Sequence, residues 1–413
     1  MSLVFRYAET PDLPRIAELL VHSFPGVGHT TSRWEQIITD FPHGGIETAW
    51  VAEENSRIVA MCRIYRLDQW ISGVVIPIMG LGMVAISATD RRRGLAGRLV
   101  ESALIKSRQR GDLASVLYPF RDSFYRKLGY GMAGEVQQFL LPPGEFPDHP
   151  GRKRVRIVPL PEGRELISPI YDQWAPAQTG QLRRSVRAWE RVWEDGGRYA
   201  AVYHNESGDP EGYAVFHYRM ATPTEGAALD IEEIIWLNRE ARLGLYGWIS
   251  SLSDQWRQVI YRAHPDEAFT EHVNTLRQPE LKAARWHHWF PTSVTLSGPM
   301  FRLLDVDGAW AARRVRPGPP LTVELEVTDP QIPGNEGRRV LTLADGEVRV
   351  APEGGAADLR MSIGIEPLSR IYIGALTPSA AVLSGLATVD QPELSTWLDA
   401  LLAVPRPWTF DRF

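Results

Sequence analysis

The chain has 413 residues, of which 44% are hydrophobic and 23% are charged, and its formal net charge is −5 at pH 7. At about 150 residues per domain, this length predicts two or three domains that each bury a core. The composition excludes a disordered or fibrous chain, and the mild acidity argues against general binding of nucleic acid, whose affinity comes from neutralised phosphates. A single cysteine, Cys62, excludes an intrachain disulfide framework and a cysteine-rich zinc module.

No segment is typical of a secretion signal or a membrane span. The N-terminal residues lack a basic stretch followed by an apolar one. The longest apolar run, residues 74–86, is shorter than the roughly 20 residues that cross a bilayer, and it contains Pro77, Gly80 and Gly82. We interpret this run as paired buried strands and expect a cytoplasmic protein with no membrane partner.

Up to about residue 140, predicted strands and helices alternate. Apolar residues recur with helical spacing over residues 11–23 and again after Arg93, where Gly111 supplies the stop signal. Short apolar runs between turn residues predict strands at 3–8, 48–52, 57–66, 81–87 and 113–118.

Two further units follow. A Pro-rich and basic stretch at residues 141–154 predicts a solvated linker rather than a nucleic-acid patch. The second unit repeats the strand–turn–helix–strand order of residues 81–118; its predicted elements are a helix at 185–193, strands at 200–204, 213–218 and 231–236, a helix to about 252, and a strand at 258–262. The third unit shows a hairpin at 340–350 around Asp345-Gly346, followed by helices at 378–386 and 392–403.

The segment from Gly82 to Gly97 carries the most specific chemical signal. A predicted strand ends in a turn rich in arginine and glycine, and a helix begins at once. The N-terminus of a helix presents unpaired N–H groups and the positive end of the dipole, which suits a pyrophosphate. Gly94 and Ala96 would let phosphate oxygens approach the backbone. The turn matches no common dinucleotide or P-loop pattern, so a basic turn that only caps a crossover helix is an equally good interpretation of these residues alone.

Two motifs resemble those of the GCN5-related N-acetyltransferases. Arg91-x-x-Gly94-x-Ala96 is similar to the acetyl-CoA loop of that superfamily, and Ser123-Phe-Tyr125-Arg-Lys-Leu-Gly129-Tyr130-Gly131 resembles its short helix followed by glycine and an aromatic residue. Over nearly its full length the chain is similar to the Eis-like (enhanced intracellular survival) acetyltransferases, and Phe301-Arg-Leu-Leu-Asp305-Val306 resembles the start of their third domain.

The resemblance implies a fold of class α/β (α+β). It consists of two tandem GCN5-related acetyltransferase folds and a sterol-carrier-protein-like α+β domain. The implied ranges are 1–145 for the catalytic domain, 150–298 for a degenerate second copy and 299–413 for the third domain, whose tail would enter the active site.

The second copy departs from the acetyl-CoA loop. Aligning Asp90 with Asn238 places Gly94 on Arg242, so a large side chain replaces the glycine that lets phosphate approach the backbone. We therefore predict that the second unit does not bind acetyl-CoA and that it serves as structure and as pocket wall.

The resemblance also implies the residues that bind acetyl-CoA. The end of a strand would pair with the pantetheine arm as an added strand, the turn and the first helical residues would hold the pyrophosphate, and two later residues would add contacts. These positions are Val84, Ala85 and Ile86, then Arg92, Arg93, Gly94, Leu95, Ala96 and Gly97, and finally Phe120 and Arg121. The family has small or acidic residues at the last two positions, so this chain departs from its pattern there.

Tyr125 matches the general acid of the family. A phenol with an ordinary pKa of about 10 stays protonated at neutral pH and can protonate the leaving thiolate. A packing role stays open, because the chain contains 13 tyrosines. Tyr130 is the rival candidate, and we expect it to pack.

The general base implied by the resemblance is the C-terminal carboxylate, here that of Phe413, with Trp408 and Phe410 as anchors of the tail. An α-carboxyl has a pKa of about 3.3–3.7, so it needs burial or a relay water to act as a base. A frayed terminus is the alternative. Three histidines are interpreted as surface or structural residues: His22, His29 and His43.

The implied substrate is a small-molecule primary amine. Phe24 and Trp34 are predicted to form an aromatic wall of its pocket. Arg412 would repel a polycationic amine, so acceptance of aminoglycosides stays open. His287-His288 lacks an accompanying cysteine or carboxylate cluster, so no metal is expected. The resemblance further implies a homo-oligomer, with a hexamer as the assembly it suggests.

The leading hypothesis is an acetyl-CoA-dependent N-acetyltransferase that transfers directly, since Cys62 has no histidine partner nearby in sequence for a covalent mechanism. Two alternatives remain: a non-enzymatic carrier of an apolar ligand in the sterol-carrier-like domain, and an acetyl-CoA-binding sensor without turnover. The turn at residues 91–97 favours the enzyme over the carrier, because a carrier does not need it.

Overall fold

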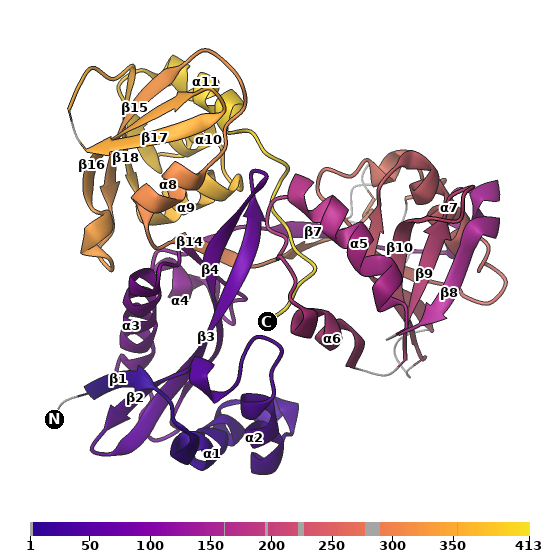
Figure 1. Cartoon of the computed structure of the whole chain (residues 1–413), viewed down its shortest axis with the longest axis horizontal. Helices are drawn as coiled ribbons and strands as arrows, with labels where there is room; N and C mark the ends of the chain where they lie inside the picture. The colour runs from indigo at the N-terminus through magenta and orange to yellow at the C-terminus, as the bar shows by residue number, and fades with distance from the viewer. Residues whose placement is uncertain (1–2, 161, 195–196, 222–226, 277–289, 353) are drawn as a thin grey trace. The chain divides into compact units, whose positions relative to one another are not determined.

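The computed structural model of the chain describes residues 3–160, 162–194, 197–221, 227–276, 290–352 and 354–413 (Figure 1). They fall into two compact units. Unit 1 comprises Met1–Gly134, Pro299–Pro407 and Asp411–Phe413, and unit 2 comprises Glu135–Gly298 and Trp408–Phe410. No helix among the described residues is long and apolar enough to cross a membrane.

Unit 1 contains a seven-stranded sheet whose long central hairpin closes at Ser72-Gly73, where both residues have positive φ, as such a tight turn requires. In spatial order the strands are β1 (Leu3–Tyr7), β2 (Ala49–Glu54), β3 (Arg57–Ile71), β4 (Val74–Ile86), β5 (Ala114–Leu117), β14 (Met300–Leu303) and β6 (Gly131–Met132). Strand β4 pairs in parallel with β5 from Ile78 to Leu81. Among the described residues, positions 82–86 of β4 have no strand partner on the β5 side.

The expectation of paired strands within residues 74–86 is wrong, because β4 is one strand that pairs with β3 over its whole length. Pro77 lies within this strand opposite Asp68 of β3, and its carbonyl accepts a hydrogen bond from Leu113 N at 2.9 Å, just before the pairing with β5 begins. Met83, with φ +51°, marks the irregularity in the register.

Side-chain alternation along these strands produces two cores. Trp50 and Ala52 of β2 belong to the core covered by α3, whereas Ala49 and Val51 belong to the core covered by α1 and α2. The helices of this region are α1 (Leu13–Ser23), α2 (Thr31–Thr39), α3 (Leu95–Arg110) and α4 (Asp122–Arg126).

Unit 1 also contains a five-stranded sheet in the order β17-β16-β15-β18-β19. The Asp345-Gly346 hairpin is confirmed, with positive φ at both turn residues. The strands are β15 (Leu321–Thr328), β16 (Gly337–Ala344), β17 (Glu347–Pro352), β18 (Leu359–Gly364) and β19 (Ala387–Val389), and the helices are α8 (Val306–Ala312), α9 (Ile365–Ile373), α10 (Pro378–Leu383) and α11 (Pro392–Leu402). Buried and partly exposed residues alternate along β15, so this sheet has one buried face and one open face.

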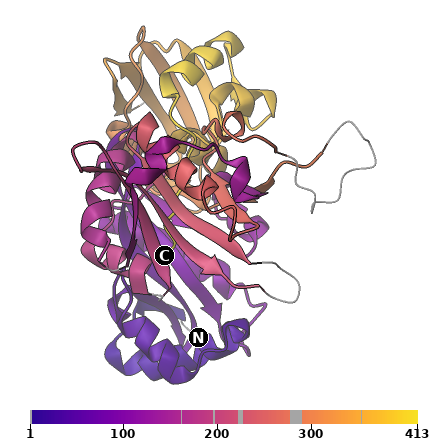
Figure 2. The ribbon, with the colours of Figure 1, turned by 90° about the vertical axis from the view of Figure 1, so that its right-hand side faces the viewer.

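Unit 2 is built on a second seven-stranded sheet, and α5 lies against its strands in both views of the ribbon (Figures 1 and 2). In spatial order the strands are β13 (Val294–Ser297), β7 (Glu135–Leu141), β12 (Val259–Ala263), β11 (Ala228–Trp236), β10 (Pro210–Arg219), β9 (Arg198–His204) and β8 (Val155–Pro159), and the helices are α5 (Arg164–Trp174), α6 (Val186–Glu194) and α7 (Arg239–Ser250). The order β11–α7–β12 confirms the predicted repeat of β4–α3–β5.

The stretch predicted as a solvated linker is instead packed into unit 2. Leu141 ends β7, Phe146 is buried in the core, and Pro150–Arg154 forms a 3-10 turn against α7. A Cβ on Gly151 would lie 3.2 Å from the Cα of Gly244, so its glycine permits a close approach of two backbones. The prolines and glycines that predict a linker in the sequence form packed turns in the structure.

Candidate active site

The turn between β4 and α3 is organised by the carboxylate of Asp90. It accepts hydrogen bonds from Arg57 at 2.9 and 3.0 Å and from Arg93 at 2.6 Å. The hydrogen bonds from Arg57 above all hold the pKa of Asp90 well below its usual range. Arg93 also donates to Glu54 at 2.9 and 3.0 Å, so its charge is shared between two carboxylates and its side chain fixes the turn.

The backbone of this turn is exposed where α3 begins. Gly94, with φ +73°, precedes the helix, and no side chain caps the helix N-terminus, so the N–H groups of Leu95, Ala96 and Gly97 have no intrahelical acceptor. A Cβ on Gly94 or Gly97 would meet no atom within 4 Å. In the described part of the chain, Arg92 has no ion-pair partner, and its φ is +61°. This open, basic helix N-terminus fits a phosphate group.

The predicted pantetheine strand is the free end of β4. Ala85 and Ile86 pair with Met61 and Ala60 of β3, which leaves the other side of this backbone without a strand partner among the described residues. Ala85 is buried in the α1–α2 core, whereas Val84 and Ile86 pack against the α3 core. The segment is therefore held on both faces and retains one edge that can pair with an extended ligand.

Tyr125 lies on α4, directly after β5, and its side chain is buried. Its ring meets those of Phe120, Phe124 and Tyr130 edge-on, with centroids 5.6, 4.9 and 5.9 Å away. Its hydroxyl has no hydrogen-bond partner among the described residues, and burial raises its pKa above the ordinary value. Tyr125 is therefore a protonated phenol with a donor to offer.

Tyr130 differs from Tyr125 in one respect that bears on their roles. Its hydroxyl makes a 2.6 Å hydrogen bond with the Oγ of Ser115, so this phenol is already satisfied inside the core. The packing role expected for Tyr130 agrees with this contact.

Phe120 and Arg121 stand at the entrance to α4. Phe120 is 71% exposed although its ring lies 5.8 Å from that of Phe124, and Arg121, also exposed, precedes the first turn of the helix. A large exposed aromatic ring beside Tyr125 is suited to contact a ligand.

Phe413 lies over the middle of the first sheet. Its ring centroid is 5.7 Å from that of Tyr118, 6.2 Å from that of Tyr65 and 6.5 Å from that of His43. The Tyr118 hydroxyl donates to the carbonyl of Asp411. A Cβ on Gly80 of β4 would lie 2.9 Å from the Phe413 ring, so this glycine makes room for the ring.

His43 is a neighbour of Phe413 that sequence reasoning missed. The sequence predicts a surface or structural histidine at this position, and its ring packs edge-on with those of Phe413 and Tyr65. Buried Arg63 holds the loop of His43 by donating to Gly45 O at 2.9 Å. No local pattern signals this contact, because Phe413 lies at the far end of the sequence.

The tail before Phe413 belongs to unit 2, where it is firmly held. Trp408 is buried, its N–H donates to Thr179 O at 3.1 Å, and its carbonyl accepts from Gln181 at 3.2 Å. Its ring lies 4.2 Å from that of Phe410 and 4.9 Å from that of His264. The tail is thus packed rather than frayed.

Of the remaining predicted site residues, Phe24 and Trp34 lie apart from these contacts, whereas Arg412 directly precedes Phe413 and its charge acts on Tyr118. Trp34 is buried in the α1–α2 core with Phe24 at 5.8 Å, and Arg412 is exposed. In the described residues, no contact joins Phe24 or Trp34 to Tyr125 or Phe413. His287-His288 lies outside the described residues, and within them no three His, Cys, Asp or Glu side chains are grouped to hold a metal.

Three family comparisons cover most of the chain. Residues 4–133 and 180–294 each match an acetyltransferase (GNAT) domain, and residues 306–410 match a sterol carrier protein domain. The N-acetyltransferase Eis of Mycobacterium tuberculosis and that of Mycobacterium bovis are each 25% identical over 376 residues, which covers 86% of this chain and 86% of theirs.

Solved structures show the same fold at full length. A GCN5-related N-acetyltransferase from Anabaena variabilis has a TM-score of 0.84 at 22% identity and covers 100% of both chains. Eis1 from Mycobacterium abscessus has a TM-score of 0.79 at 18% identity and covers 99% of this chain and 100% of its own. The solved structures show the fold, and the two acetyltransferase matches together with the likeness to Eis over 86% of the chain show the family: the chain belongs to the Eis-like GCN5-related N-acetyltransferases, with two acetyltransferase folds and a sterol-carrier-like domain.

Proposed function

We propose that the first acetyltransferase fold transfers the acetyl group of acetyl-CoA directly to a primary amine of a small molecule, with Tyr125 as general acid and the Phe413 carboxylate as general base. The main support for this proposal is that a single strand, β4, lies next to all three parts of the proposed site. Strand β4 has Phe413 against Gly80, a free edge at residues 82–86 and the open turn to α3 at its end.

The residues present fit acetyl-CoA, which as a cosubstrate supplies an acyl group already activated as a thioester. The backbone of Val84–Ile86 offers hydrogen-bonding groups to an extended arm. The N–H groups at the start of α3 and the side chain of Arg92 offer donors and positive charge to phosphates. Arg93 supports this site through its bonds to Asp90 and Glu54.

The chemistry requires two proton movements. The amine nitrogen forms a bond to the acetyl carbon, and the carbon–sulfur bond breaks. The Phe413 carboxylate takes the proton that the amine nitrogen loses, and Tyr125 gives its phenolic proton to the departing sulfur. Buried Cys62 is not a nucleophile in this scheme, since burial raises the pKa of its thiol and keeps it protonated.

His43 is a second candidate for the base, because its ring lies against Phe413. A neutral imidazole has an ordinary pKa of about 6.5 and is a better base at neutral pH than an ordinary α-carboxyl. Substituting His43→Gln separates the two: retained turnover assigns the base to Phe413, and a loss as large as that from removing Phe413 assigns it to His43.

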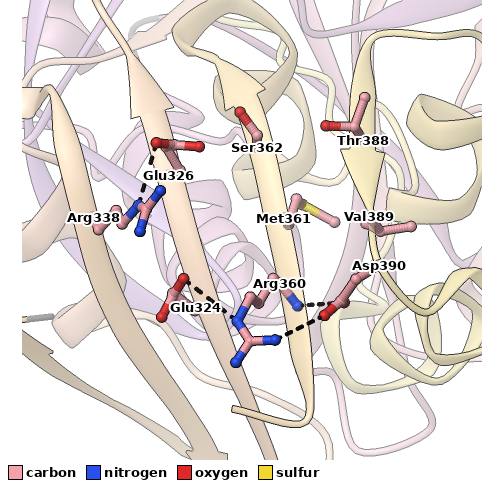
Figure 3. Close-up of a pocket in the computed structure, with 9 residues that line it drawn as sticks. All are labelled: Glu324, Glu326, Arg338, Arg360, Met361, Ser362, Thr388, Val389 and Asp390. Atoms are coloured by element: carbon pink, nitrogen blue, oxygen red, sulfur yellow. Dashed lines mark hydrogen bonds and ion pairs between the residues drawn. The ribbon is translucent and has the colours of Figure 1, made fainter. Parts of the chain in front are cut away.

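The carrier alternative receives no support from the hollow that the structure shows in the sterol-carrier-like region. This hollow of about 280 Å³ lies on the five-stranded sheet and is lined mainly by charged and polar side chains. Arg360 pairs with Glu324 and Asp390 at 3.7 and 3.3 Å, and Arg338 pairs with Glu326 at 3.3 Å (Figure 3). An apolar ligand would have to desolvate these ion pairs.

The decisive test is acetyl transfer by the full chain and by a variant that lacks Arg412 and Phe413. We expect the intact chain to release coenzyme A in the presence of at least one member of a panel of primary amines, including an aminoglycoside, a diamine and an arylalkylamine. Loss of a proton-transfer group costs about 10²–10⁴-fold in turnover, so the shortened chain should lose that much while it stays folded.

A matched control places a short Gly-Ser extension at either end of the chain. The C-terminal extension should reduce turnover like the deletion, whereas the N-terminal one should not. Tight acetyl-CoA binding with no transfer to any amine would instead support the sensor. The predicted homo-oligomer is tested by analytical ultracentrifugation of the same preparation.

A further inference from the structure

A fully buried ion pair lies against the turn that ends α4, the helix that carries Tyr125. Arg302 is on β14, the strand inserted between β5 and β6, and Asp329 follows β15 of the five-stranded sheet. The Nη2 of Arg302 donates to both carboxylate oxygens of Asp329, at 2.8 and 2.9 Å, and both side chains have 0% exposure. Asn335 donates to the same carboxylate at 2.9 Å.

The other end of the guanidinium reaches the turn that ends α4. Its Nη1 donates to the carbonyl of Leu128, and Gln331 Nε2 donates to the carbonyl of Lys127 at 3.1 Å. Carbonyls at the end of a helix have no intrahelical partner and need donors from elsewhere. The N–H of Leu128 in turn donates to the carbonyl of Tyr125 at 2.9 Å, so the held carbonyls lie one short turn from the phenol.

Gly129 shows how closely the two parts approach. Its φ is +81°, and a Cβ at this position would lie 1.7 Å from the Nη1 of Arg302. A side chain would therefore displace the guanidinium, and the glycine of the motif is needed here for both reasons. Gly129 of the first acetyltransferase fold therefore leaves the space that the guanidinium of Arg302 occupies.

A buried ion pair contributes little net stability, because desolvation offsets the attraction, but removing one partner leaves an uncompensated charge. What this pair adds is direction, since Nη2 is bound to both oxygens of Asp329 and Nη1 of the same planar guanidinium is bound to the carbonyl of Leu128. We propose that Arg302 and Asp329 are positioning residues for Tyr125, so that the sterol-carrier-like region orients the proton donor of the transferase. This inference rests on the proposed role of Tyr125.

The test compares Asp329→Asn with Asp112→Asn in the full-length protein. Asp112 is a matched control, because it is a buried carboxylate paired with an arginine, Arg110, just before β5, and its hydrogen bonds run to Arg110 and Ser107 rather than to α4. The measurements are kcat and KM for acetyl-CoA with one accepted amine of the panel, and the pH dependence of kcat. The same measurements are repeated in the Tyr125→Phe background.

We expect Asp329→Asn to lower kcat about 10- to 100-fold, as a small misplacement of a reacting group does, with KM for acetyl-CoA nearly unchanged. The alkaline limb of kcat should move to lower pH, because solvent that reaches a loosened Tyr125 lowers its raised pKa toward the ordinary value. In the Tyr125→Phe background the same substitution should cost almost nothing. Asp112→Asn should leave kcat and its pH profile intact.

The outcomes separate the two proposals. Full turnover by Tyr125→Phe overturns the proposed role of Tyr125. Two outcomes overturn only the positioning role. In the first, Tyr125→Phe lowers kcat but Asp329→Asn does not. In the second, Asp329→Asn lowers kcat by the same factor with Tyr125 and with Phe at that position. If Asp329→Asn does not fold by circular dichroism, Gln331→Ala replaces it. This variant removes the bond to Lys127 O and the 3.5 Å bond from Arg302 Nη1, and it should lower kcat about 3-fold.

Discussion

The two acetyltransferase folds share one order of elements but differ where a cofactor would enter. In the first fold, α3 begins without a side-chain cap and Gly94 borders open space. In the second, Asn238 caps α7 by accepting from Ala241 N at 2.9 Å, and the guanidinium of Arg242 lies 5.8 Å from the Trp236 ring centre. The helix N-terminus that would bind phosphate is therefore occupied by the chain itself in the second copy.

The two folds also differ beside their central parallel strands, β4 and β5 in the first fold and β11 and β12 in the second. Strands β11 and β12 pair at only two positions, and the core beside them is filled by aromatic side chains. The Tyr261 ring stacks on Phe269 at 4.3 Å, and the hydroxyls of Tyr246 and Tyr261 both donate to half-buried Glu267. The same topology thus supports a site in one copy and a closed core in the other, and the side chains decide which.

The largest expected effect comes from copying the second fold into the first. Gly94→Arg should abolish acetyl-CoA binding, measured by titration calorimetry, because it puts a long side chain over the amides of α3 and forces a non-glycine residue to φ +73°. Gly94→Ala is the control for the backbone, with a strain of about 1 kcal/mol and no long side chain. Normal binding by Gly94→Arg would show that phosphate does not sit at this turn.

Next in size is the contrast between Tyr125, the proposed general acid, and a tyrosine with a structural role. Tyr125→Phe should lower kcat by about 10²–10⁴-fold and keep the affinity for acetyl-CoA. Tyr261→Phe in the second fold should keep kcat but lower the free energy of unfolding by about 1–3 kcal/mol, because half-buried Glu267 loses a donor that comes from the core. Rate assays and urea unfolding of both variants measure the contrast, and equal effects on kcat would erase it.

A smaller effect is expected at Gly80. A Cβ there would lie 2.9 Å from the Phe413 ring and 2.6 Å from Leu67 Cδ1, so Gly80→Ala should displace the ring and lower kcat about 10-fold. In a Phe413→Leu background the smaller side chain should soften the effect of Gly80→Ala. A Gly80→Ala variant with full activity would mean that the position of the Phe413 ring does not matter for turnover.

The pH profile gives a further distinction. A general acid acts in its protonated form, and burial raises the pKa of Tyr125, so kcat should not fall on the alkaline side until above the ordinary tyrosine value of about 10. Tyr125→Phe should remove that limb. A limb near pH 8 in the unmodified protein would point to another acid.

The smallest effect is expected from the reverse substitution, which copies the glycine of the first fold into the second. Arg242→Gly restores the glycine of the loop but leaves the Asn238 cap and the aromatic filling in place. Titration should still give one acetyl-CoA per chain. A second binding event would show that Arg242 alone closes the second fold.

Local patterns in the sequence were enough for the elements and for the loop motif. The Asp345-Gly346 hairpin, the helix after Gly94 and the repeated strand–helix–strand order all depend on residues close together in the chain, so turn chemistry and periodicity identify them. The resemblance added the roles of Tyr125 and Phe413, which periodicity alone does not supply.

Only the tertiary structure decided which distant residues meet. Residues 141–154 read as a linker because proline and glycine punctuate both linkers and packed turns. The insertion of β14 between β5 and β6, the contact of His43 with Phe413 and the pairing of Arg302 with Asp329 join residues far apart in sequence. Such contacts arise when buried surfaces and charges find complementary partners, and no short window of sequence contains both partners.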